Sequence, residues 1–217
     1  MTDHVWLSNA YMDTRIKLFV ETDVNAANPE NASKAQQLNN NGAPVPAELC
    51  PSKIWASEGA ADYDQMPAGS MPELFYARGH WIVSEKAAAV LRQFDLGGGA
   101  LYPLREGVFG KDQKARVAGE FFTWIFGNLK RTFLPDQTAN KMPFGVAGLR
   151  WNLPWKLKDG DIAVSSAALI GPDVWLDDTL FDAIFLSQPL GDALVAAGLK
   201  RAFHLHKARV ISVSEGI

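Results

Sequence analysis

The stretch that decides the fold runs from Asp182 to Val210 and reads DAIFLSQPLGDALVAAGLKRAFHLHKARV. An apolar run over 183–186 ends at Ser187, whose hydroxyl can cap a helix, and a proline follows in the first turn, where its missing N–H costs nothing. Apolar residues then recur at the helical spacing i, i+3, i+4 and i+7: Leu190, Ala193, Leu194 and Ala197. Gly198 follows at the position where glycine ends a helix without strain. The stretch predicts a strand, a short capped helix and an exit strand beginning near Phe203.

The same design occurs earlier in the chain. An apolar run over 81–83 precedes Ser84, which can cap a second helix. Its apolar stripe is Ala87, Val90, Leu91 and Phe94, followed by three glycines at 97–99 and an expected exit strand over 101–104. Aligning Ser84 with Ser187 matches Leu91 with Leu194. The pattern fits two related strand-helix-strand units, although a serine between a strand and a helix is also a common independent solution.

The remaining patterns predict an α+β fold with a mixed or antiparallel sheet and a few short capped helices. Residues 15–21 predict an early strand, 74–83 a further strand and 121–126 a central aromatic strand. Between them, 23–51 is rich in asparagine and proline and predicts a long polar excursion, with at most a short helix over 32–38. We therefore expect an N-terminal strand and excursion (1–73) packed on a main α+β domain (74–217).

Composition narrows the class of protein. The hydrophobic fraction is 47%, which is ordinary for a globular chain, and no run approaches the length of a membrane span. The first residues lack a basic start followed by a long apolar core, so we expect no secretory signal. The single Cys50 excludes an internal disulfide framework and fits a reducing compartment. We expect a cytoplasmic protein without a membrane partner.

Three segments in this order, IVSEKAAAVLRQF, GEFFTWIFGNL and DVWLDDTLFDAIFLSQPLGDALVAAGL, resemble the Imm11 family, also described as the DUF1629 domain. The resemblance covers about residues 74–210 and lies in apolar runs, the step from serine into helix and the Ala-Ala-Gly-Leu ending. It implies a bacterial immunity protein, which binds and neutralises the toxin domain of a polymorphic toxin system. It also implies a binding role without catalysis, and no cofactor.

An acidic block identifies candidate partner-binding residues. Residues 159–192 contain seven aspartates and no Lys or Arg, whereas 105–158 carry ten basic and four acidic residues. Such a block can steer a basic partner, or its aspartates can occupy turns and caps. Trp175 lies among these aspartates and is either an interface anchor or a core residue. The candidate partner-binding residues are Trp175, Asp173, Asp177, Asp178 and Asp182.

Signals for catalysis are few. His204 and His206 share a face if they lie in one strand, as some metal sites require, but further ligands are not evident and we expect no metal. A small enzyme or ligand-binding regulatory domain built near these histidines is the alternative function. Ser84 and Ser187 lie in neither G-x-S-x-G nor S-x-x-K, so capping explains them better than nucleophilic catalysis. Basic and aromatic residues interleave over 111–133, but the net charge of −3 argues against a nucleic-acid partner.

Overall fold

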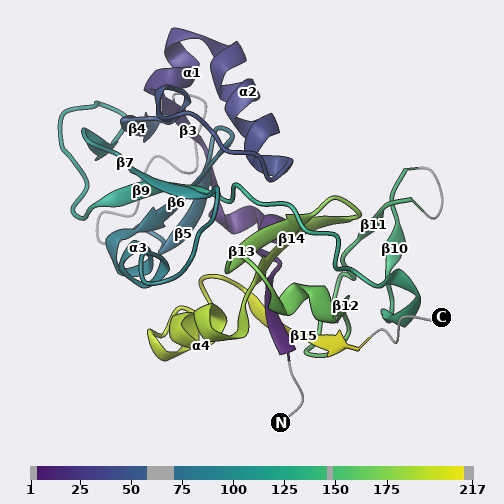
Figure 1. The fold of residues 1–217 in the computed structure, drawn as a ribbon. Coiled ribbons are helices and arrows are strands. Elements are labelled where there is room, and N and C mark those ends of the chain that lie inside the picture. The colour runs from purple at the N-terminus through teal and green to yellow at the C-terminus, as the bar shows by residue number, and fades with distance from the viewer. Residues whose placement is uncertain (1–3, 58–70, 146–148, 213–217) are drawn as a thin grey trace.

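The computed structural model describes residues 4–57, 71–145 and 149–212, and it has the α+β fold with short helices that the sequence predicts (Figure 1). The helices are α1 (Asp23–Ala27), α2 (Pro29–Asn40), α3 (Glu85–Leu91) and α4 (Gln188–Ala196), with short 3-10 helices η1 (Ala10–Met12), η2 (Thr14–Ile16), η3 (Ala47–Leu49), η4 (Pro135–Gln137) and η5 (Ser166–Leu169). The strands are β1 (His4–Ser8), β2 (Lys17–Leu18), β3 (Val20–Thr22), β4 (Lys53–Ala56), β5 (Leu74–Ala77), β6 (His80–Ser84), β7 (Ala100–Pro103), β8 (Gly107–Phe109), β9 (Phe121–Ile125), β10 (Met142–Pro143), β11 (Trp151–Asn152), β12 (Ala163–Ser165), β13 (Val174–Asp177), β14 (Leu180–Leu186) and β15 (Leu205–Ile211).

Two sheets repeat one arrangement of four antiparallel strands. In the first sheet the order is β5-β6-β9-β7, and β2 joins it outside β5. In the second sheet the order β13-β14-β1-β15 has the same pattern, extended by β10, β11 and β12. Each unit consists of a hairpin, a helix and an exit strand, with a strand from elsewhere in the chain inserted beside the hairpin. The two predicted strand-helix-strand units therefore share their topology.

The two units pack helix against helix. Ser84 caps α3 by accepting a hydrogen bond from the backbone N–H of Ala87, and Ser187 caps α4 in the same way from Leu190. α3 and α4 contact each other, and Leu91 and Leu194 are fully buried in one cluster that also holds large aromatic side chains of both sheets. The predicted caps and buried leucines are confirmed. The principal core thus lies between the two units.

The N-terminal residues depart from the expected division at 73/74. β1 is inserted between β14 and β15, and Figure 1 shows this purple strand running through the C-terminal half of the molecule. β3 and β4 form a third sheet with β8, which belongs to the segment after 74. The predicted strand over 15–21 is instead η2 followed by the short β2 and β3, and the predicted strand over 74–83 is the β5–β6 hairpin. Both sides of the expected boundary therefore contribute to shared sheets.

The short helix expected over 32–38 lies within α2, but the expectation of little other regular structure over 23–51 is wrong, because α2 is longer and α1 precedes it. Thr22 caps α1, and Asn28 caps α2 with Pro29 in the first helical turn. Asn39 is buried, donates to the carbonyl of Trp124 and accepts from the backbone N–H of Phe126. The polar residues that suggest a loop therefore cap helices and bond the α2 end to β9.

Gly191 in α4 supports a quantitative prediction. A Cβ atom added there would lie 1.9 Å from Cδ1 of Trp6, so Gly191→Ala should lower the free energy of unfolding by about 3 kcal/mol. Gly198→Ala is the matched control, because a Cβ atom added there would have no atom within 4 Å. Its backbone φ of +76° strains alanine, so this variant should lose about 1 kcal/mol of unfolding free energy. Urea unfolding of both variants measures the difference. Equal losses would contradict the close packing of β1 on α4.

Candidate functional site

The two histidines line one pocket of about 320 Å³ together with Lys200, Arg201 and Leu205, but they do not lie in one strand. His204 precedes β15 and has φ of +49°, so the expectation that both histidines lie in one strand is wrong. The Nε2 atom of His204 lies 3.1 Å from Asp13 Oδ2, and the Nδ1 atom of His206 lies 3.7 Å from Asp159 Oδ1. Each histidine therefore faces its own carboxylate. Within the described residues, no group of three or more His, Cys, Asp or Glu side chains is placed to hold a metal ion.

The prediction that Trp175 is an exposed interface anchor is wrong, because its side chain is fully buried. Its ring stacks on Phe185 with centroids 5.5 Å apart, and its Nε1 donates to Thr132 Oγ1. The Nζ atom of Lys130 lies 3.9 Å from the ring centroid, and burial lowers the pKa of Lys130 to about 8. Trp175 thus belongs to the core of the C-terminal sheet and is not available to a partner on the surface.

Asp173 has a local structural role. Its carboxylate accepts a hydrogen bond from the backbone N–H of Asp95, and its own N–H donates to the Asp95 carbonyl. These bonds join the start of β13 to the segment after α3. Asp173 therefore lies at the opposite end of β13 from Asp177.

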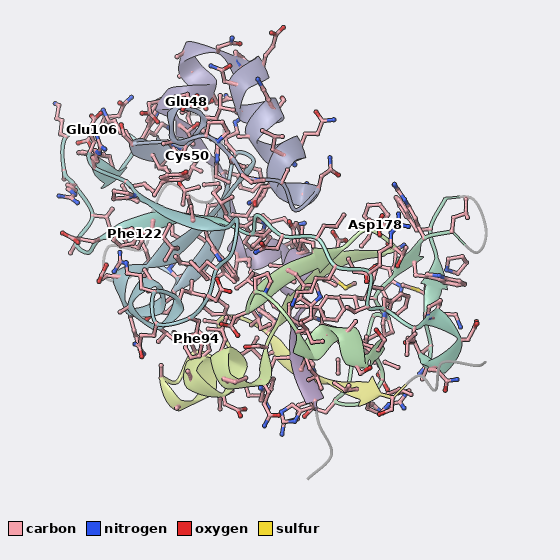
Figure 2. All side chains as sticks on the ribbon, viewed as in Figure 1. Glu48, Cys50, Phe94, Glu106, Phe122 and Asp178 are labelled. Carbon is pink, nitrogen blue, oxygen red and sulfur yellow. The ribbon has the colours of Figure 1, made fainter. Side chains whose placement is uncertain are left out.

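The other three predicted aspartates meet in one cavity of about 350 Å³ at the turn of the β13–β14 hairpin. Figure 2 labels Asp178 at this turn, on the side of the molecule where β10 and β11 lie. The lining residues are Tyr11, Asn40, Asn41, Leu129, Arg150, Leu176, Asp177, Asp178, Leu180, Phe181, Asp182 and Ala183. We call this cavity the hairpin cleft. It joins residues of η1, the α2 end, β13 and β14, which are far apart in sequence.

Asp177 and Asp178 point in different directions, as neighbouring residues at a strand end do. The buried Asp177 carboxylate accepts hydrogen bonds from the backbone N–H groups of Thr132, Phe133 and Thr179 and from the Thr179 hydroxyl. Asp178 instead forms a two-pronged ion pair with the exposed guanidinium of Arg131. Asp177 therefore stabilises the hairpin turn, and Asp178 lies at the surface of the cleft.

Asp182 differs from both neighbours. Its backbone has φ of +59°, a left-handed conformation that aspartate and asparagine adopt more readily than most residues. It lies between the part of β14 that pairs with β11 and the part that pairs with β1. Partial burial raises the pKa of Asp182, and the positive charge of Lys17 opposes this shift. Its exposed carboxylate accepts no hydrogen bond from the residues that the structure describes.

Apolar side chains border the hairpin cleft. Leu129 is 47% exposed, and the exposed ring of Phe144 packs on Phe181 with centroids 4.4 Å apart. The guanidinium of Arg150 lies 5.3 Å from the Phe181 centroid, within the range of a cation–π contact. Sequence reasoning missed these four residues, because no spacing relates them and only the pairing of distant segments brings them together.

A second polar cluster lies under α1. The Nε2 atom of the buried His80 and the Oδ1 atom of Asp23 have no hydrogen-bond partner among the described residues. The other oxygen of Asp23 accepts hydrogen bonds from the backbone N–H and the hydroxyl of Ser52. Burial lowers the pKa of His80 to about 4, and the negative charge of Asp23 opposes this shift. His80 is therefore neutral in the folded protein at neutral pH.

Comparisons of the chain with protein-family models, curated proteins and solved structures give no match. Within the described ranges, no helix combines the length and the apolar character needed to cross a membrane.

The buried His80 predicts acid sensitivity. Between pH 6.5 and 4 the unfolded chain binds a proton that the folded chain excludes, so stability is complete above pH 6.5 and falls with decreasing pH. The slope should approach about 1.4 kcal/mol per pH unit. Urea unfolding at pH 7, 6 and 5 measures it, and His80→Gln should reduce the slope, leaving the part that comes from His206, whose pKa burial also lowers. The low pKa of Asp13, about 2, adds acid sensitivity mainly below this window. An unchanged slope in His80→Gln would contradict the assignment.

The two neighbouring aspartates give a matched pair of variants. Asp177→Asn replaces a buried carboxylate oxygen by an amide that faces backbone donors, and should cost about 3 kcal/mol of unfolding free energy. Asp178→Asn removes an exposed ion pair and should cost under about 1 kcal/mol. Thermal and urea unfolding measure both values. Equal costs would mean that Asp177 does not hold the turn.

Proposed function

We propose that the chain is an immunity protein of the Imm11 type, which binds a cognate toxin domain in the bacterial cytoplasm and neutralises it by covering its surface. The sequence resemblance over about residues 74–210 supports this role. The hairpin cleft supports it independently, since it joins exposed apolar side chains with carboxylates on a rigid hairpin. Interfaces commonly combine an apolar centre with a charged rim in this way.

The hydrogen bonding of Asp177 and Asp178 favours a structural role for these two residues over catalysis. The Asp177 carboxylate is saturated by backbone and hydroxyl donors, and Asp178 is held by Arg131. A general acid or base needs an oxygen that can reach a reacting proton. These two aspartates instead fix the shape of the hairpin, and neutralisation then follows from occlusion of the toxin surface.

The direct experiment co-expresses the chain with the toxin domain encoded next to it. We expect a stable complex to co-purify and the cells to survive toxin expression. A chain that neither binds this domain nor protects the cells would overturn the proposal.

Two leucines of similar exposure locate the contact surface. Leu129, 47% exposed, borders the hairpin cleft, whereas Leu169, 49% exposed, lies outside it. Leu129→Lys should weaken toxin binding by about tenfold or more, because a desolvated lysine replaces an apolar contact. Leu169→Lys should leave the affinity unchanged, as measured by calorimetry. Weakening by Leu169→Lys alone would place the interface elsewhere.

A further inference from the structure

We propose that the hairpin cleft receives an arginine side chain of the partner, and that Arg150 occupies part of this place in the free chain. The identity of the partner rests on the proposed function. The chemistry of the cleft rests on three observations: its charges, its aromatic wall and the position of Arg150.

The carboxylates give the cleft an electronegative wall. Asp182 presents an exposed carboxylate without a hydrogen-bond partner among the described residues, and Asp177 accepts its hydrogen bonds from neutral backbone and hydroxyl donors. Asn40 and Asn41 stand at the carboxyl end of the 12-residue α2, where the helix dipole adds partial negative charge. Asp182 and the α2 end therefore attract a cation that enters the cleft, whereas Arg150, which lines the cleft, and Lys17, which acts on Asp182, oppose it.

The aromatic wall favours guanidinium over ammonium. Phe181 lines the cleft with a ring that contacts Phe144 and Arg150, and Tyr11 contributes a second ring whose hydroxyl donates to Asn40 Oδ1. A planar guanidinium stacks on such faces and donates to a carboxylate in the same geometry, which a lysine ammonium does less well. A cavity of about 350 Å³ has room for a side chain of this size.

Arg150 already shows this mode of contact. Its guanidinium lies over Phe181, and no carboxylate of the described residues lies within ion-pair distance of it. Arg150 itself is exposed, so its contact with the ring is readily displaced. A partner arginine would take the Phe181 face and gain the Asp182 carboxylate, while Arg150 moves into solvent.

The opposite reading makes Arg150 a recognition group for an anionic or zwitterionic ligand. The two readings predict opposite effects of removing Arg150 on the affinity for the ligand. Removing Arg150 raises affinity for a basic side chain, because a competing cation is lost, but lowers affinity for an anion or a zwitterion. A single variant therefore separates them.

The experiment titrates the full chain with Nα-acetyl-arginine amide and follows amide shifts by NMR. Nα-acetyl-citrulline amide, which has the same shape without the charge, is the matched ligand control. We expect weak saturable binding of the arginine compound with shifts at residues of the cleft, and none with the citrulline compound. Comparable binding of both compounds, or no binding of either, would overturn the proposal.

Two variants with controls complete the test. Asp182→Asn, which keeps a residue suited to the left-handed backbone, should weaken binding by about tenfold, whereas Asp136→Asn removes an exposed charge that does not line the cleft and should have little effect. Arg150→Met should strengthen binding by about threefold, and the distant Arg105→Met should not. Weaker binding of the arginine compound to Arg150→Met would overturn the proposal.

The same variants separate this inference from the proposed function. If the toxin domain co-purifies but its affinity is unchanged by Asp182→Asn, the arginine site is wrong and the immunity role stands. If the arginine compound binds as expected but the toxin domain does not, the cleft chemistry holds and the immunity role is wrong.

Discussion

The contact between Trp6 and Gly191 joins the first described strand to the last helix, and the arrangement of the C-terminal half depends on it. The indole lies where any side chain at Gly191 would stand, and its Nε1 donates to Asp192 Oδ1. This packing holds β1 between β14 and β15 and brings α4 onto the core shared with α3. Tyr11 follows β1 closely, so the same contact positions one wall of the hairpin cleft.

Local interactions account for the part of the fold that sequence analysis predicts. The serine caps, the helical stripes and the strands on either side involve residues at most a few positions apart, so their signals are adjacent in the chain. The aromatic run of β9 was also a local signal, since such a run is typical of a central strand, and β9 is buried along its whole length between β6 and β7. The common topology of the two units was visible in part from the alignment of Ser84 with Ser187.

Long-range interactions account for what sequence analysis did not predict. The burial of Trp175 depends on Lys130 and Thr132, which lie more than 40 residues earlier. Asn39 bonds to Trp124 and Phe126, at or just after β9, 85 and 87 residues away. The polar composition of its own segment carries no trace of these bonds and therefore suggests a loop. Three of the five predicted site residues do meet in the hairpin cleft, but the acidic block could not identify which aspartates are saturated by backbone donors.

The position of β1 in its sheet affects when that sheet can form during synthesis. β5, β6, β7 and β9 come from one continuous stretch of chain, so that sheet can assemble while the ribosome is still synthesising the rest. β1 is translated long before its sheet neighbours β14 and β15, which follow it far along the chain. The sheet that contains β1 therefore closes only after β15 has been translated, and we expect this long loop closure to be slower than assembly of the sheet of β5, β6, β7 and β9.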